Sequence, residues 1–525
     1  MSQQIQQDPS MSRHYLGGIG DWLKFHAWSK PDKDAVVYNG KRFSYGKLDE
    51  RVNRAASVLA ARGITKGSRV ALLMVNSNAF LEVFFACAKL GAIAVPLNFR
   101  LSPKELEFII NDAEASVIVY HARFLGLIEP IRAETTLTFA MCVNGECGEG
   151  VNGAEGDLDY EECLAGSKAT EPGVSVSQQD PLMMMYTSGT TGRPKGALLT
   201  HANPVWIAMN TQMSALAFNQ SDNTLTVAPL FHIGGLAIYT LPMLYCGSTI
   251  VLQSQFDPES LLQTLESEKI TTLFLLPAMW LMLSQRPDFD KYDLSSLKVL
   301  LSGGAPCPIP VIEFFQKRGF QFLEGFGMTE TCASACVLTN EDAVRKNGSV
   351  GKPLIHVEMR IVDENDNDVA PGETGELVLR GPSMFREYWN RPEATEEAWR
   401  NGWFHSGDLS RQDEEGFYYI VDRKKDMLIS GGENVYPTEV EQVLYRHPKV
   451  KDVAVIGIPD DKWGEVPMAL VVPADGEELT LEEMVAHCEG NLARFKIPKH
   501  LTLLDELPRT ATGKVLKREL RKQYQ

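Results

Sequence analysis

The sequence has little positive charge. Its 525 residues contain 51 lysines and arginines against 68 aspartates and glutamates, which gives a net charge of −17. A general nucleic-acid-binding protein gains its affinity from basic surface, so this balance argues against that class. It does not exclude a small anionic ligand, because a single loop can bind phosphate whatever the charge of the whole chain.

The sequence also lacks the cysteine patterns of zinc sites and redox pairs. Its nine cysteines form no CxxC pair, and Cys332 and Cys336 have no second pair that would complete a zinc site. We therefore expect reduced cysteines in cores or pockets, as in a reducing cytosol. The polar N-terminus, MSQQIQQDPSMSR, shows no signal-peptide pattern, and we expect a cytoplasmic protein.

One stretch lacks charge altogether. No residue from Ile233 to Phe256 is charged, and about 20 apolar residues are enough to span a bilayer. Glycines, a proline and hydroxyl residues interrupt this run, however, and it ends in the strand-like STIVLQ. A buried helix, a turn and a central strand explain it better than a membrane span. Peripheral association with a membrane stays open, and so does the choice between a monomer and a homodimer.

Apolar runs with the length of strands recur along the chain. Amphipathic segments separate several of them, and continuous apolar strands between helices predict a parallel sheet covered on both faces. The predicted strands are 69–76, 92–98, 116–122, 248–253 and 271–279, and 102–115 is a predicted helix.

The pattern of predicted elements changes near residue 360. Glycine turns and short β segments over 360–422 predict a small β subdomain, and DRKKDMLISGGENVYP (422–437) has the charges, glycines and proline of a hinge. We predict an α/β protein in three parts. A large N-terminal domain of layered, helix-covered sheets with a β subdomain takes 1–422, a hinge 423–427, and a small mobile α/β domain 428–525. Its basic end, KVLKRELRKQYQ, predicts a solvated helix.

The loop YTSGTTGRPKG (186–196) offers backbone N–H groups, hydroxyls and one lysine, which suit phosphate oxygens. It is no Walker loop, because Pro194 precedes Lys195, and Gly196 follows where a Ser or Thr would bind magnesium. On its own, the loop fits either a phosphate site or a flexible surface turn.

Seven further motifs decide between these alternatives. Together with the loop, and in the same order, they make the chain resemble the adenylate-forming superfamily of acyl-CoA synthetases, luciferases and peptide-synthetase adenylation domains. In texture the chain is most similar to bacterial fatty-acyl-CoA and aryl-CoA ligases. The seven motifs are APLFHIGG (228–235), SGGAPC (302–307), EGFGMTE (324–330), GWFHSGDL (402–409), DRKKD (422–426), SGGENVYP (430–437) and PRTATGKV (508–515).

The resemblance implies an acid–thiol ligase that uses ATP, Mg²⁺ and coenzyme A. A carboxylate attacks the α-phosphate of ATP to give an acyl-adenylate and pyrophosphate, and a thiol then displaces AMP. Both steps develop negative charge on oxygen, which calls for positioned donors and a metal. A carrier-protein phosphopantetheine is the alternative thiol. The chain has no damage at its predicted reactive residues, so we expect an enzyme and not a binding module.

The resemblance also assigns residues to ATP. Thr329 takes the α-phosphate and Glu330 the Mg²⁺, while Asp408 and Arg423 bind the ribose. The full set implied for ATP or AMP is Thr187, Ser188, Gly189, Thr190, Thr191, Gly192, Lys195, Gly304, Ala305, Pro306, Glu324, Gly325, Phe326, Gly327, Asp408, Arg423 and Asn434.

The resemblance places the remaining chemistry near the C-terminus and in the charge-free stretch. Lys514 is the implied catalytic lysine of adenylation, Lys425 the pivot, and Gly431 with Gly432 the lining of the thiol tunnel. Phe231, His232 and Gly235 form the implied acid site. An apolar, cation-free wall favours a hydrocarbon acid. We expect a medium- or long-chain fatty acid, with an aryl acid as the alternative.

Overall fold

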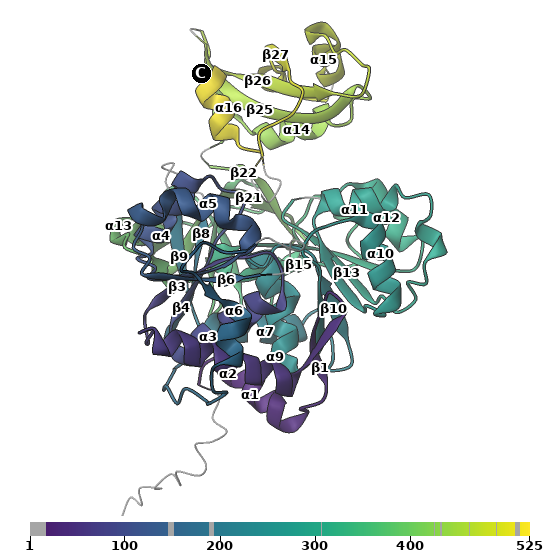
Figure 1. Cartoon of the computed structure of the whole chain (residues 1–525). Coiled ribbons are helices and arrows are strands. Elements are labelled where there is room, and N and C mark those ends of the chain that lie inside the picture. Colours follow the sequence, from purple (N-terminus) through teal and green to yellow (C-terminus); the bar gives the residue numbers. More distant parts are fainter. Residues whose placement is uncertain are drawn as a thin grey trace, which may run out of the picture. The chain divides into compact units, whose positions relative to one another are not determined.

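The structure is a computed structural model (Figure 1), and it describes residues 17–144, 152–187, 194–305, 307–424, 426–430, 433–460, 462–489, 491–509 and 515–524. The chain divides into two compact units. The first contains Met1–Glu358 and Arg380–Gly402, and the second contains Met359–Leu379 and Trp403–Gln525. The predicted α/β class is confirmed. The hinge at 423–427 stays a prediction.

The first sheet of the first unit consists mainly of parallel strands. In the described residues its order is β19-β9-β8-β4-β3-β5-β6-β7. Three predicted strands lie side by side at its centre, where β3 pairs in parallel with β4 and β5. The strands are β3 (Arg69–Leu73), β4 (Ile93–Pro96), β5 (Val117–His121), β6 (Phe139–Val143), β7 (Leu158–Asp159), β8 (Pro181–Thr187), β9 (Lys195–Thr200) and β19 (Glu387–Tyr388).

Helices bury the apolar strands of this sheet. The predicted helix 102–115 is α4 (Pro103–Asp112), which Ser102 and Glu105 begin with a reciprocal capping box. Its Leu106, Ile109 and Ile110 pack into the core of the sheet. Further helices of the unit are α1 (Gly20–Ser29), α2 (Tyr45–Ala61), α3 (Asn78–Leu90), α5 (Leu125–Ile128), α6 (Tyr160–Ala165), α7 (Ala202–Gln212) and α13 (Pro392–Ala398).

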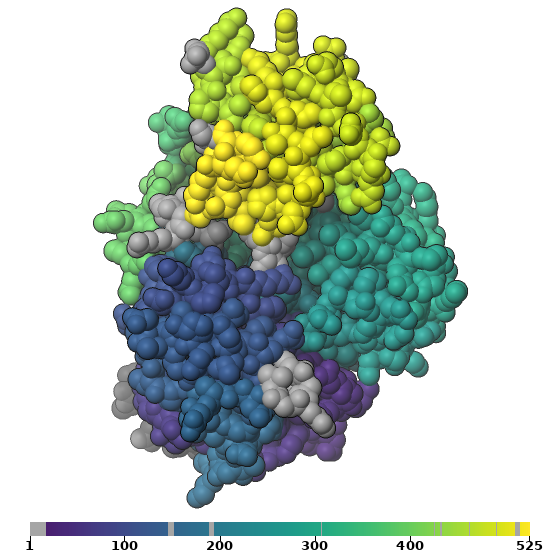
Figure 2. Space-filling model, turned by 45° about the horizontal axis from the view of Figure 1, so that its top comes forward, coloured from purple at the N-terminus to yellow at the C-terminus, as the bar shows by residue number. Residues whose placement is uncertain are grey.

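The second sheet of this unit has the order β16-β15-β14-β13-β12-β10-β11-β1-β2 in the described residues. Its strands are β1 (Asp34–Tyr38), β2 (Lys41–Ser44), β10 (Asn223–Thr226), β11 (Thr249–Leu252), β12 (Thr272–Leu275), β13 (Val299–Gly303), β14 (Gln321–Met328), β15 (Ala333–Leu338) and β16 (Lys352–Pro353). Helices α10 (Pro258–Ser267), α11 (Pro277–Ser284) and α12 (Ile309–Gln316) form the teal surface over it in Figure 2.

The charge-free stretch folds as predicted. It forms a short helix α8 (Ile233–Gly235), a π-helical segment η4 (Leu236–Thr240) and α9 (Leu241–Cys246). Gly247, with φ of 77°, ends the helix, and β11 follows as a central strand. No helix within the described ranges is long and apolar enough to cross a bilayer.

The second unit contains the predicted β subdomain. Strands β17 (Glu358–Val362), β18 (Gly375–Arg380), β21 (Trp403–Gln412) and β22 (Tyr418–Arg423) form its sheet. A further sheet combines β23 (Leu428–Ser430), β24 (Glu433–Val435), β25 (Val450–Asp460), β26 (Gly464–Pro473) and β27 (His500–Leu503) with α14 (Pro437–Leu444), α15 (Leu481–Cys488) and α16 (Lys517–Tyr524).

The basic end of the chain is a helix, but the prediction of a solvated helix is wrong. Leu520 of α16 is 2% exposed and belongs to an apolar cluster with residues of β25 and β26. Lys517 pairs with Glu441 at 2.9 Å, and Arg521 pairs with Asp426 at 2.7 Å. The high density of charge in this tail concealed the apolar residues that anchor one face of the helix.

Candidate active site

The two ends of the predicted phosphate loop lie on paired antiparallel strands. Thr187 is the last residue of β8, Lys195 is the first of β9, and the two are paired across the ladder. Ser188, Gly189, Thr190, Thr191 and Gly192 lie outside the described residues. A strand begins at Lys195, where a Walker loop would be followed by a helix, so the prediction that this is no Walker loop is confirmed.

The turn that carries Thr329 and Glu330 is strained. It joins β14 to β15 through a single 3₁₀ turn, after which Cys332 and Ala333 have φ values of 56° and 91°. Such left-handed backbone is costly in residues other than glycine and is concentrated at functional sites. The Thr331 hydroxyl stabilises the turn, since it accepts from the Met328 amide at 2.9 Å and donates to the Ala333 carbonyl at 2.8 Å.

Close packing explains the glycine at position 327. A Cβ there would lie 1.4 Å from the carbonyl oxygen of Ala333, so only glycine allows β14 to pass this turn. Thr329 and Glu330 are 9% and 8% exposed. The turn therefore holds both predicted reactive side chains on a backbone with little freedom.

Glu330 has a defined partner. The phenol of Tyr388 donates to its Oε1 at 2.9 Å, and the same ring lies 5.2 Å from the ammonium of Lys195. Among the residues that the structure describes, no group of three or more His, Cys, Asp or Glu side chains is placed to hold a metal. Mg²⁺ bound to nucleotides often takes only one or two carboxylates and completes its shell with phosphates and water. The single carboxylate of Glu330 fits that kind of site.

The two motifs predicted for adenine are neighbours. β13 and β14 run parallel and pair Gly303 with Gly325, so SGGAPC and EGFG meet at the carboxyl ends of these strands. Gly304 and Ala305 are exposed, Phe326 is half-buried, and Pro306 is outside the described residues. Ligands of α/β proteins bind at such strand ends.

Glu324 is the unusual group in this region. It is 6% exposed, and one carboxylate oxygen accepts from the Cys307 amide at 2.9 Å. Within the described residues its other oxygen, Oε1, has no hydrogen-bond partner. Burial raises the pKa of the Glu324 carboxyl to about 7.

The second unit brings together the two residues predicted for the ribose. Asp408 of β21 is paired with Arg423 of β22, and their side chains form an ion pair at 2.6 Å. Asp408 is 2% exposed, so burial and a cation hold its carboxylate in place. Asn434 lies on the exposed side of β24. Lys425, Gly431, Gly432 and Lys514 lie outside the described residues.

The region predicted for the acid has an accessible face. Between Phe231 and Thr240, only His232, Gly234 and Ile238 are partly exposed. His232 Nδ1 accepts from the Gly234 amide at 3.2 Å. Gly235 is buried, and a Cβ there would lie 2.2 Å from the Pro229 carbonyl oxygen, so backbone packing requires that glycine.

Comparison with known proteins identifies the family. The family model described as "AMP-binding enzyme" matches residues 23–389, and the model described as "AMP-binding enzyme C-terminal domain" matches residues 439–514. The chain belongs to the AMP-binding enzyme family. The similar proteins described below are named CoA ligases, and the chain is an AMP-forming acid–thiol ligase that uses ATP, Mg²⁺ and coenzyme A.

Three relatives show the range within the family. A feruloyl-CoA synthase of Amycolatopsis sp is 41% identical over 97% of this chain and 99% of its own. The long-chain-fatty-acid–CoA ligase FadD13 of Mycobacterium tuberculosis is 38% identical, with 97% and 99% covered. The structure of the anthranilate CoA ligase AuaEII with anthranoyl-AMP has a TM-score of 0.88 at 28% identity, and covers 98% of each chain.

Sequence reasoning missed two side chains beside these sites. Tyr388 contacts Glu330, and the ring of Phe274 lies 3.4 Å from the place that a Cβ at Gly234 would take. Neither has a sequence signal of its own, because each matters through a contact that only the fold creates. Tyr388 and Glu330, for instance, are 58 residues apart in the chain.

The raised pKa of Glu324 predicts a change of stability with pH. The native carboxyl binds its proton more tightly than the unfolded one, whose pKa is near 4.5. Its contribution to stability is therefore complete below pH 4.5 and is lost as the pH rises through about 7. Glu324→Gln resembles the protonated form at every pH. We expect it to melt like the native chain at pH 5 and to be more stable at pH 8, by on the order of 2 kcal/mol.

Thermal unfolding at the two pH values measures this difference. Glu313→Gln is the control, because Glu313 is on the surface of α12 and its pair with Lys317 contributes little at either pH. An equal effect of Glu324→Gln at pH 5 and pH 8 would contradict the assignment of a protonated Glu324.

Proposed function

We propose that this enzyme activates an aryl-substituted monocarboxylic acid as its CoA thioester. The observation that carries the proposal is the likeness to two relatives named for aryl acids, the feruloyl-CoA synthase at 41% identity and the anthranilate CoA ligase with a TM-score of 0.88. Beside the predicted acid residues, the ring of Phe274 packs against Gly234, where a Cβ would lie 3.4 Å from the ring. An aryl group of the acid can stack on such a ring.

The accessible face beside Phe274 is mainly apolar. Ile238 contributes an aliphatic side chain, and Phe274 is 8% exposed in β12. His232 is the titratable side chain of this face, and no Lys or Arg occurs between Asn223 and Phe256. A second carboxylate or a phosphate on the acid would find no cation within this segment. These features favour an acid with one carboxylate and an apolar body.

The proposed reaction assigns a role to each group. The carboxylate of the acid attacks the α-phosphorus of ATP, the bond to the β-phosphate oxygen breaks, and pyrophosphate leaves. Lys195 and the hydroxyl of Thr329 stabilise the phosphate oxygens, and Asp408 with Arg423 holds the ribose. Glu330 would hold Mg²⁺, which when bound would neutralise charge on the phosphates. Lys514 is proposed to assist this step. In the second step the CoA sulfur attacks the acyl carbon and AMP leaves.

A long-chain fatty acid is the second candidate. Its support is FadD13, which at 38% identity is nearly as similar to this chain as the feruloyl-CoA synthase at 41%. The charge-free stretch would suit an alkyl chain as well. The aryl acid comes first because the feruloyl-CoA synthase is the more similar of these two relatives, and because the ring of Phe274 offers an aromatic contact that a flexible alkyl chain does not require.

A panel of acids separates the two candidates. The purified enzyme, ATP and Mg²⁺ are incubated with arylacrylic, arylacetic, benzoic and C8 to C16 alkanoic acids, with and without CoA, and the products are identified by mass spectrometry. We expect acyl-CoA from the aryl acids only when CoA is present. Preference for the alkanoic acids would support the second candidate. Acyl-adenylate that accumulates in the presence of CoA would indicate a carrier-protein thiol.

Gly234→Ala tests the contact with Phe274. The added methyl meets His232 and Phe274 at 3.4 Å, an ordinary contact, so the fold should persist while the methyl covers part of the Phe274 ring. One methylene in an apolar pocket changes specificity by about 10- to 200-fold. We expect kcat/KM for aryl acids to fall by about tenfold or more, with a much smaller change for alkanoic acids of similar length.

The matched control is Gly126→Ala, because a Cβ at Gly126 meets no atom within 4 Å. This control should leave kcat/KM unchanged for every acid. An equal loss for aryl and alkanoic acids in Gly234→Ala would contradict a contact between the aryl group of the acid and Phe274.

A further inference from the structure

We propose that Tyr388 is a positioning residue that holds Glu330 and Lys195 ready for Mg·ATP. The inference rests on the proposed function, in which these two side chains meet the metal and the phosphates. Tyr388 reaches one through its hydroxyl, at 2.9 Å, and the other through the face of its ring, at 5.2 Å. One side chain thus contacts both an anion and a cation of the nucleotide site.

The strand of Tyr388 also fixes the backbone on both sides. The Phe385 amide donates to the Glu330 carbonyl at 2.7 Å, and the Trp389 amide donates to the Gly196 carbonyl at 2.8 Å. β19 pairs with β9, with Tyr388 opposite Ala197. Residues 385–389 therefore bridge the strained Glu330 turn and the base of the phosphate hairpin. A shift of this segment would move both.

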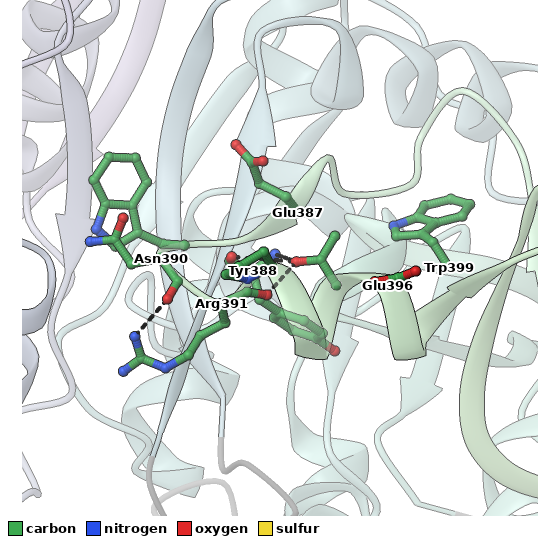
Figure 3. A pocket seen from close by; sticks show the side chains of 9 residues that line it. Glu387, Tyr388, Asn390, Arg391, Glu396 and Trp399 are labelled. Carbon is green, nitrogen blue, oxygen red and sulfur yellow. Dashed lines mark hydrogen bonds between the residues drawn. The ribbon is translucent and has the colours of Figure 1, made fainter.

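Tyr388 is itself held by its neighbours. Its amide donates to the Thr395 hydroxyl at 3.0 Å, and that hydroxyl donates to the Arg391 carbonyl at 2.8 Å. The ring of Phe385 lies 4.7 Å from its ring. Figure 3 shows these bonds at the pocket formed by the turn after β19 and by α13, with Tyr388 at its centre. These contacts hold the backbone and the ring of Tyr388 in place, so its hydroxyl can orient Glu330 from a defined position.

A tyrosine suits this double task for a physical reason. Its hydroxyl fixes one oxygen of Glu330 while the carboxylate keeps its charge and its other lone pairs for a metal. Its ring attracts the ammonium of Lys195 without neutralising it. Among the described residues, no carboxylate lies within ion-pair distance of Lys195, so its charge stays available for phosphate.

The test measures nucleotide binding without turnover. Binding of ATP to the full-length enzyme is measured by calorimetry over a range of Mg²⁺ concentrations, with no acid or CoA present. Tyr388→Phe removes the hydroxyl and keeps the ring. A hydrogen bond to a charged group is worth enough to shift a binding constant by about tenfold. We expect the Mg²⁺ concentration at half-saturation to rise by about tenfold, with little change in ATP binding in EDTA.

Two further variants identify the partners. In a Glu330→Gln background, Tyr388→Phe should have little additional effect on the Mg²⁺ dependence, because the two changes disrupt one interaction. Tyr388→Leu also removes the ring, and it should weaken ATP binding in EDTA as well. This additional loss should disappear when Lys195 is replaced by Met.

The matched control is Tyr160→Phe, which removes a 2.7 Å bond from a buried phenol to Glu82 in the same unit. It should lower the melting temperature and leave the Mg²⁺ dependence unchanged. An unchanged Mg²⁺ dependence in Tyr388→Phe, with normal binding by the native chain, would overturn this inference alone. If the native chain fails to bind Mg·ATP, the proposed function falls and this inference falls with it.

Discussion

The contact between Gly327 and the carbonyl of Ala333 is the constraint on which the predicted reaction centre depends. It allows β14 to turn back into β15 within four residues, at the cost of left-handed backbone at Cys332 and Ala333. That cost is met by the β ladder on either side and by the hydroxyl of Thr331. The result is a short turn that presents Thr329 and Glu330 in one conformation.

The groups around this turn are also held in fixed positions. The hairpin of β8 and β9 supplies Lys195, and the segment around Tyr388 joins the hairpin to the turn by main-chain and side-chain contacts. Groups that meet a charged nucleotide gain from being fixed before it arrives, since reorganisation during the reaction would raise the barrier. In the second unit, Asp408 and Arg423 are held in a comparable way by opposite positions on paired strands.

Much of the fold could be predicted because apolar runs report burial directly. The runs 69–76, 92–98 and 248–253 contain strands because their central residues are apolar and buried. The run 271–279 is a strand only to Leu275, because Pro277 begins α11. The division of the strands of the first unit between two sheets could not be predicted, since strand order depends on contacts between residues far apart in the chain. The charged residues of α16 concealed the few apolar residues that bury one face of this helix.

In the candidate site, too, features within one motif could be predicted from the sequence, and contacts between distant elements could not. Ordered motifs predict a phosphate loop, a reactive turn at Glu330 and ribose contacts at Asp408 and Arg423, and these roles stay predictions. The structure adds that Asp408 and Arg423, which come from two motifs, form an ion pair. The contact of Tyr388 with Glu330 and the place of Phe274 beside Gly234 arise only when distant elements pack. The roles assigned to Lys425 and Lys514 rest on their motifs, since both lie outside the described residues.

The central claim is that a carboxylate oxygen attacks the α-phosphorus of ATP. It is tested most directly with the preferred acid labelled with ¹⁸O in both carboxylate oxygens, followed by mass spectrometry of AMP and pyrophosphate after one turnover with CoA. The account predicts one ¹⁸O atom in AMP and none in pyrophosphate. Label in pyrophosphate, or unlabelled AMP with acyl-CoA formed, would contradict it.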